Sequence, residues 1–416
     1  MFIQGVFGIL ALVAIAWVMS ENRWKVKLRD ILVRLAMQFI LAAVMLKLPV
    51  FKEIFQLMSK VAMSLEEATK AGTSFVFGYL GGGTLPFDEK FPGSSFVLAL
   101  QALPLVLVVS ALSSLLFYWR ILPIVVKSLS WILQKTMDIG GAVGVSAAAN
   151  VFLGMIESPL FIRPYLKKMS RSELFITMTC GMAGIAGTVM VLYANILKTI
   201  VPDAMGHILT ASIISIPAAI MISQIIIPET GKMIAGELTP SQLATNSMDA
   251  ITKGTLEGIN LLINIISMLI VLIALVYLTN KALGLLPSFG NQPVTLQRIL
   301  GYIMSPVAWL IGIPWPEALT AGSLMGTKTI LNEFIAYIDL SKLPDGALSA
   351  RSRLIMTYAL CGFANFGSVG MMIGGMGSMV PERRDEIVSL GIKSIIAGTL
   401  ATCMTGAIVG IFTNNV

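Results

Sequence analysis

Long apolar runs recur along the whole chain and are separated by short polar segments. Runs near 20 apolar residues are about long enough to cross the hydrocarbon core of a bilayer as helices. The pattern therefore predicts an all-α, polytopic membrane protein. The clean apolar runs cover residues 2–19, 31–49, 95–118, 205–227, 259–286, 296–313 and 388–412.

Two polar interruptions suggest how the chain is divided. Residues 50–92 mix charges with apolar positions and end in a Gly- and Pro-containing stretch, which predicts an interfacial helix followed by an aqueous loop. Residues 228–255 are the longest polar stretch and are expected to link two halves. We therefore expect a scaffold of N-terminal spans and interfacial helix at 1–92, a first repeat at 93–230 and a second repeat at 231–416.

Two apolar regions, residues 139–200 and 314–380, are broken in similar ways. Each contains an acid in an apolar run and, after it, a Cys-Gly-x-Ala sequence that begins a glycine-rich span. Corresponding broken segments in two halves indicate the substrate site of a secondary transporter, whereas chance similarity between Gly- and Ala-rich segments is the alternative. The acids are Glu157 and Glu333, and the motifs are CGMAGIAGT at 180–188 and CGFANFGS at 361–368.

Glu157 lies in the apolar stretch VFLGMIESPL, two residues before Pro159. A carboxylate at membrane depth costs several kcal/mol and must face protein or water. Proline limits helix continuity, and irregular backbone at that depth is tolerated only where it is buried or lines a cavity. We therefore expect Glu157 at the tip of a re-entrant hairpin facing a cavity, and Glu333 at a matching position. The alternative is that both acids lie at the membrane surface, with Glu157 beside Arg163.

Asparagine side chains accompany both acids. Asn150 precedes the first, and Asn365 lies in the stretch FANFGS, where Gly362 and Gly367 favour an unwound helix. Amides and carboxylates together suit a neutral, hydroxyl-rich ligand, because carboxylates accept strong hydrogen bonds from hydroxyl groups. Ordinary interhelical hydrogen bonds are the alternative.

Composition agrees with a membrane protein and sets its orientation. Of 416 residues, 56% are hydrophobic and 12% charged, against about 25% charged in soluble domains. The net charge of +7 comes from basic residues that flank the spans, so nucleic acid is not an expected partner. The first polar loop contains Arg23, Lys25, Lys27 and Arg29, which predicts that it is cytoplasmic and that the N-terminus is outside.

Motifs of common enzymes and metal sites are missing from the sequence. Cys180, Cys361 and Cys403 lie in apolar segments without metal-ligand spacing, and His207 is the single histidine. An intramembrane enzyme is disfavoured because no Ser/His or paired-Asp pattern occurs, and a passive channel is disfavoured by the matched broken repeats.

The chain resembles the concentrative nucleoside transporters, in their bacterial branch, almost from end to end. NEFIAY and CGFANFGSVG are the most specific of the shared motifs. The motifs are GTSFVFG at 72–78, ALPLVLVVSALSSLLFY at 102–118, SAAANVFLGMIESPL at 146–160, GIPWPEA at 312–318, NEFIAY at 332–337, CGFANFGSVG at 361–370 and GIKSIIAGTLA at 391–401.

The resemblance implies a homotrimer of about eight-span protomers in the bacterial inner membrane, each with two opposed re-entrant hairpins related by an inverted repeat. It implies ion-coupled nucleoside import by alternating access, driven by sodium or protons. It also implies that Glu333, Asn365 and Ser368 bind the ribose, that Phe363 lies near the substrate, and that Glu157 belongs to the tip that handles the base.

This sequence departs from the family at the base-binding tip. The family reads Gly-Gln-Thr-Glu, whereas this chain has Gly154, Met155, Ile156 and Glu157. A uracil would lose two hydrogen-bonding side chains, each worth about 1–3 kcal/mol in a dry site. We therefore expect weaker discrimination between bases, and a purine or modified nucleoside, or another sugar-bearing solute, is the alternative substrate.

The implied sodium site departs as well. The resemblance places it at Asn150, at the carbonyls of Leu153 and Ile185, and at Gly184, where the family has a serine. The glycine keeps a carbonyl but offers no hydroxyl. Water can replace a hydroxyl ligand, so we expect sodium coupling with lowered affinity, and expect Gly184→Ser to tighten it. Proton coupling through Glu157 or Glu333 is the alternative.

Overall fold

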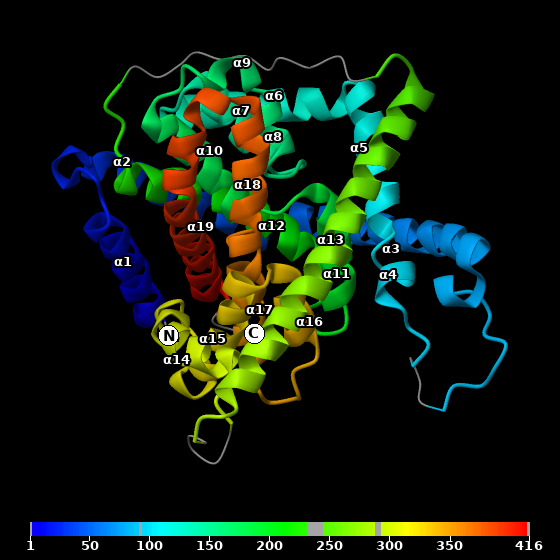
Figure 1. The fold of residues 1–416 in the computed structure, drawn as a ribbon. Helices are drawn as coiled ribbons and strands as arrows, with labels where there is room; N and C mark the ends of the chain where they lie inside the picture. Colours follow the sequence, from blue (N-terminus) through cyan, green and yellow to red (C-terminus); the bar gives the residue numbers. More distant parts are fainter. Residues whose placement is uncertain (1, 91–93, 232–243, 288–292, 414–416) are drawn as a thin grey trace.

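The computed structural model describes residues 2–90, 94–231, 244–287 and 293–413, and these segments contain helices and no strand, which confirms the all-α fold class (Figure 1). The helices are α1 (Phe2–Val18), α2 (Leu28–Lys47), α3 (Pro49–Phe77), α4 (Leu98–Gln101), α5 (Leu105–Tyr118), α6 (Ile121–Met137), α7 (Gly141–Ala149), α8 (Glu157–Leu160), α9 (Arg163–Leu166), α10 (Arg171–Ala183), α11 (Gly187–Leu197), α12 (Ala204–Ile226), α13 (Ser247–Leu283), α14 (Leu296–Leu310), α15 (Trp315–Ile330), α16 (Glu333–Ser341), α17 (Ala350–Leu360), α18 (Phe366–Met379) and α19 (Arg384–Phe412).

The helix order of α5–α12 recurs in α13–α19. In each series a helix is followed by a helix pair, by a tip that contains the acid, by one or two short helices, by a broken helix and by a long buried helix. The broken helices are α10–α11 and α17–α18, and the buried ones are α12 and α19. The recurrence agrees with the expected internal repeat, while the repeat boundary near residue 92 falls at residues outside the described part.

Two details of the second half differ from the expectation. The run at 296–313 forms only the 15-residue helix α14, and the chain then bends by 119° into α15 past Gly312, whose φ of +102° suits glycine. The expected linker at 228–255 is also too long, because α13 begins at Ser247. The Asn246 side chain accepts a hydrogen bond from the Asp249 amide and starts the helix there. Residues 232–243 of that stretch lie outside the described residues.

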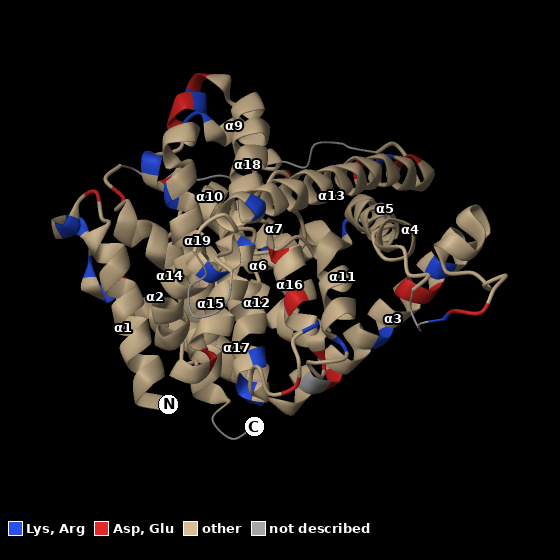
Figure 2. Cartoon of the chain, turned by 60° about the horizontal axis from the view of Figure 1, so that its bottom comes forward, with Lys and Arg blue, Asp and Glu red and all other residues tan. Residues whose placement is uncertain are grey.

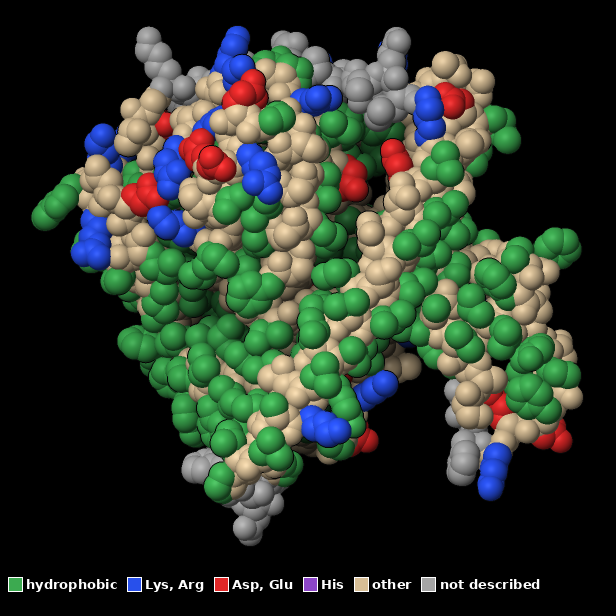
Figure 3. Space-filling view, in the orientation of Figure 1, with side chains coloured by type: hydrophobic (Ala, Val, Ile, Leu, Met, Phe, Trp, Pro, Cys, Tyr) green, Lys and Arg blue, Asp and Glu red, His purple; other side chains and the backbone are tan. Residues whose placement is uncertain are grey.

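The surface has the pattern of a membrane protein. An apolar belt crosses the molecule, with charged side chains gathered above and below it (Figure 3). The charges also collect near the α1–α2 loop and at the turn between α18 and α19 (Figure 2). Among the described residues five helices are long and apolar enough to cross a membrane, or seven if two bent pairs each count as one span. α1, with 17 residues, is shorter, so the number of eight spans stays a prediction.

The N-terminal region places α3 across the other helices. Pro49 begins α3, which is bent by 68° from α2 and runs crosswise to α18 and α19 in Figure 1. Proline suits this position because its missing amide hydrogen would have no partner in the first turn. The expected amphipathic element at 50–92 is therefore one long helix that ends at Phe77.

Candidate functional site

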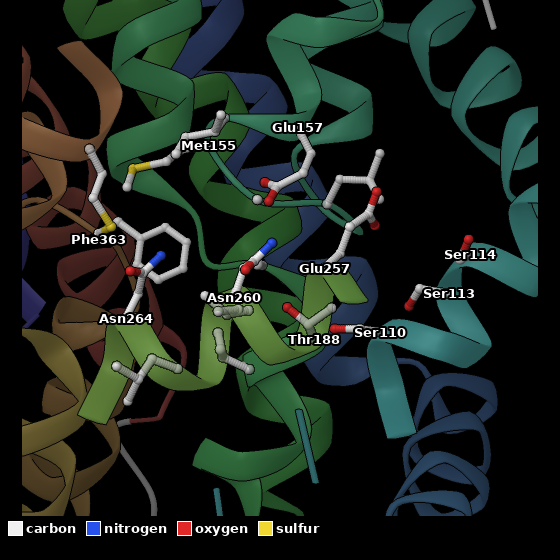
Figure 4. A pocket seen from close by; sticks show the side chains of 18 of the residues that line it. Ser110, Ser113, Ser114, Met155, Glu157, Thr188, Glu257, Asn260, Asn264 and Phe363 are labelled. Carbon is white, nitrogen blue, oxygen red and sulfur yellow. The ribbon is translucent and has the colours of Figure 1, made fainter. Parts of the chain in front are cut away.

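A cavity of about 1290 Å³ opens between α13, α5 and the two acid-bearing tips (Figures 3 and 4). We call residues 150–157 the first tip and residues 331–333 the second tip. The residues expected to bind substrate all line this one cavity, although they come from three separated segments. They are Gly154, Met155, Ile156, Glu157, Glu333, Phe363, Asn365 and Ser368.

The second tip holds Glu333 at the first position of α16. Asn332 caps that helix by accepting a hydrogen bond from the Ile335 amide at 2.9 Å. The partial positive charge of a helix N-terminus favours a carboxylate there. Glu333 is 4% exposed, so its position depends on neighbours that satisfy its oxygens.

Two side chains satisfy Glu333. The Tyr193 hydroxyl donates to Oε1 at 2.6 Å, and Asn365 Nδ2 donates to Oε2 at 3.1 Å. Each carboxylate oxygen keeps a further lone pair that can accept from a ligand. The carboxylate is thus fixed and still able to bind hydroxyl groups.

Asn365 joins the second tip to the break between α17 and α18. It caps α18, since its Oδ1 accepts from the Ser368 amide at 2.7 Å. The Ser368 hydroxyl lines the cavity and has no hydrogen-bond partner within the described part of the chain. The sequence therefore predicted the unwound helix correctly, and the structure adds that Asn365 bridges it to Glu333.

The first tip is arranged differently. The Glu157 side chain folds back over its own loop. Its Oε2 lies so close to Gly154 that a Cβ at that position would collide with it. Met155 and Ile156 sit against glycines: a Cβ at Gly181 would lie 2.9 Å from Met155 Cβ, and one at Gly375 would lie 2.7 Å from Ile156 Cγ2. The apolar pair thus fills notches in α10 and α18, and Glu157 is the one polar side chain that residues 154–157 contribute to the cavity wall.

The residues implied for a cation are Asn150 and Leu153 of the first tip and Gly184 and Ile185 after α10. Asn150 is 4% exposed, and its Nδ2 donates to the Cys180 carbonyl at 2.8 Å, while its Oδ1 has no partner. An unsatisfied buried amide oxygen is costly unless something binds it. This oxygen fits a hard cation, which prefers oxygen ligands.

Gly184 lies directly against Asn150, since a Cβ there would be 2.7 Å from Asn150 Nδ2. Gly184 and Ile185 form the break after α10, and the Gly184 carbonyl already accepts from the Phe363 amide at 3.2 Å. Leu153 lines the large cavity. No group of three or more His, Cys, Asp or Glu could hold a metal among the described residues. The oxygens of Asn150 and of the Gly184 backbone are neutral, and hard cations prefer oxygen ligands.

Several polar residues of the cavity were missed by the sequence reading. Thr188, Tyr193 and a stripe on α13 line it, and Figure 4 shows Glu157 and Glu257 on facing walls. The signal was present, because these polar residues of α13 recur at helical spacing within an apolar helix, but the expected linker at 228–255 and the apolar run at 259–286 divided them between two elements. The stripe is Lys253, Glu257, Asn260 and Asn264.

Family models cover most of the chain. Models described as the N-terminus and the C-terminus of Na+ dependent nucleoside transporters match residues 7–80 and 207–410, and a model described as nucleoside recognition matches residues 99–200. Proteins of this family are transporters rather than enzymes, and the description supports Na+ as their coupling ion.

Relatives match from end to end. The nucleoside permease NupC of Helicobacter pylori is 36% identical over 98% of this chain and 97% of its own length. The putative nucleoside permease NupX of Escherichia coli is 32% identical over 98% of each chain.

Solved structures share the fold. The inward-facing, substrate-bound structure of CNTnw has a TM-score of 0.90 at 34% identity and covers 99% of this chain and 98% of that one. An outward-facing, doubly substituted form of CNTnw has a TM-score of 0.92, also at 34% identity, and covers 100% and 98%. This multi-pass membrane protein therefore belongs to the family of Na+ dependent nucleoside transporters.

Proposed function

We propose that the protein is a Na+-coupled symporter that imports nucleosides across the bacterial inner membrane by alternating access. The observation that supports this most directly is Glu333, a buried carboxylate fixed by Tyr193 and Asn365 on the wall of the large cavity. A buried acid in a membrane protein indicates a functional site.

The ribose binds at the second tip. Its vicinal hydroxyls donate to Glu333, and the Ser368 hydroxyl and the Asn365 amide complete the contacts. Hydrogen bonds to a charged acceptor are stronger than neutral ones, so this end provides most of the affinity and is common to all nucleosides.

The base lies toward Phe363 and the first tip. Met155 and Ile156 offer apolar contact in place of hydrogen bonds, so bases are distinguished weakly. The second candidate substrate, a modified nucleoside or another sugar-bearing solute, is favoured by this same apolar lining.

Sodium binds at Asn150 together with the backbone of Leu153, Gly184 and Ile185. The unsatisfied Asn150 Oδ1 supports this assignment. Proton coupling is the second candidate for the driving ion, and the missing hydroxyl at Gly184 favours it.

The assembly is a homotrimer. α13 is the most apolar of the candidate spans, and only 11% of its apolar window is buried within the protomer, so the side of that window that does not line the cavity faces lipid or a second copy. In a bilayer the two tips belong to re-entrant hairpins, and the repeats at 93–230 and 231–416 move against the scaffold at 1–92.

Titration of purified protein tests the sugar assignment. Uridine, 2′-deoxyuridine and uracil are titrated separately in the presence of Na+. We expect affinity to fall from uridine to deoxyuridine and to be lost for uracil. Equal binding of uracil and uridine would contradict a ribose site at Glu333.

A further inference from the structure

Lys328 is a buried cation that the transport site described above does not use. It lies in the last turn of α15 and is 2% exposed. Its Nζ donates to the Ala359 carbonyl at 2.9 Å and to Thr402 Oγ1 at 3.1 Å. Within the described residues no carboxylate lies within 4.0 Å of it. Burying an ammonium group without an ion pair is expensive, so a role is expected.

The repeat supplies a comparison for this lysine. In the first half α7 packs on α10, and in the second half α15 packs on α17. Asn150, at the end of α7, donates to the Cys180 carbonyl in the last turn of α10. Lys328, at the end of α15, donates to the Ala359 carbonyl in the last turn of α17. Both halves thus place a side-chain nitrogen on the C-terminal carbonyls of a broken helix.

The two nitrogens differ in charge. The C-terminal end of a helix carries partial negative charge and exposes carbonyl oxygens, so it attracts cations. The neutral Asn150 amide leaves its own oxygen free for a cation beside α10. The ammonium group of Lys328 is itself the cation beside α17.

We propose that Lys328 is a tethered cation that occupies, in the second repeat, the place that corresponds to the sodium site of the first. It is a positioning residue: it holds the end of α15 on α17, and the second tip with Glu333 begins three residues later. This inference rests on the proposed function only in taking the site at Asn150 as a sodium site.

Chemical rescue tests the charge. Lys328→Ala leaves a space into which n-propylammonium fits, whereas 1-propanol has similar size and no charge. We expect Lys328→Met and Lys328→Ala to weaken nucleoside binding roughly tenfold or more. Propylammonium should restore binding and raise the melting temperature of Lys328→Ala, and propanol should do neither. Wild-type protein with propylammonium and Lys198→Met, at an exposed ion pair with Glu66, are the controls.

The outcomes separate this inference from the proposed function. The proposal that Lys328 is a tethered cation would be overturned if Lys328→Met bound nucleoside as the wild type does, or if propanol rescued Lys328→Ala as well as propylammonium. If wild-type protein binds no nucleoside, the proposed function fails, and the melting temperatures with propylammonium and propanol still decide the role of Lys328.

A milder pair of variants covers the case in which the Lys328 variants do not fold. Thr402→Val removes one acceptor of the ammonium group, whereas Thr402→Ser keeps it. We expect Thr402→Val to lower both the melting temperature and the nucleoside affinity, and Thr402→Ser to lower neither. Equal behaviour of the two variants would contradict the proposal.

Discussion

The two tips of the cavity follow one architectural plan and each carries an acid, but the side chains around the two acids differ. At the second tip Glu333 is held by Tyr193 and Asn365, so a charged acceptor is fixed in place. At the first tip the apolar pair Met155 and Ile156 fills glycine notches. In the proposed function this difference separates two tasks within an internal repeat: one half binds the polar sugar, while the other tolerates different bases.

The largest expected effect comes from the acid of the second tip. Glu333→Gln removes the charge but keeps the shape, and we expect nucleoside affinity to fall roughly hundredfold, alike for all bases, because they share the ribose. Isothermal titration of uridine, adenosine and inosine measures this. Glu157→Gln is the matched variant at the first tip. It should lower nucleoside affinity less than Glu333→Gln does, and by different amounts for different bases. Equal losses from the two variants would remove the distinction between the tips.

The next largest effect is expected on the Na+ dependence of nucleoside binding, from a substitution at Asn150. Asn150→Ala removes the unsatisfied oxygen, so we expect roughly tenfold more Na+ to be needed for half-maximal nucleoside binding. Affinity at saturating Na+ should change little. An unchanged Na+ dependence would show that Asn150 does not ligate the ion.

Gly184→Ser is a second test of Na+ binding at Asn150, and for this variant the structure predicts the opposite of what the sequence predicted. A serine was expected to tighten Na+ binding by adding a hydroxyl. Its Cβ would lie 2.7 Å from Asn150 Nδ2, so the amide must move first. We therefore expect Gly184→Ser to weaken Na+ dependence, as a Na+ titration of nucleoside binding will show. Tighter Na+ binding would mean that Asn150 shifts easily.

Base choice should respond more modestly. Met155→Gln with Ile156→Thr restores two polar side chains at the first tip, and we expect the preference for uridine over inosine to rise severalfold. The melting temperature should fall, because the new side chains fill the notches at Gly181 and Gly375 less well. An unchanged ratio of affinities would place the base away from this tip.

The smallest effect is expected outside both tips. Hydrogen bonds from Arg171 and then Lys393 lower the pKa of Glu21, in the α1–α2 loop, to about 2. Folding lowers the pKa of Glu21, so the ionised carboxylate stabilises the folded protein at pH values above its unfolded pKa of 4.5. This stabilisation is lost as the pH falls toward the folded pKa of about 2. At pH 7 Glu21→Gln should cost about 1 kcal/mol, given solvent screening. The difference in melting temperature from wild type should narrow below pH 4.5.

The sequence predicted the fold class and the gathering of the site residues, because acids within apolar runs, unwound-helix glycines and long apolar runs each have a clear physical signature. It missed residues whose role depends on packing between distant segments. Tyr193 lies in an ordinary apolar helix. It is 140 residues from Glu333 in the sequence, and only the fold brings the two side chains into contact. The start of α13 was missed because its polar first turns resemble a linker, although Asn246 and Asp249 form a helix cap.

Uptake into proteoliposomes that contain the purified protein tests the central claim most directly. Radiolabelled uridine is supplied outside under an imposed Na+ gradient, an imposed pH gradient without Na+, or no gradient. We predict concentrative uptake with inward Na+ alone, and its loss in Glu333→Gln. Uptake that follows the pH gradient in the absence of Na+, or that never exceeds equilibration, would contradict a Na+-coupled nucleoside symporter.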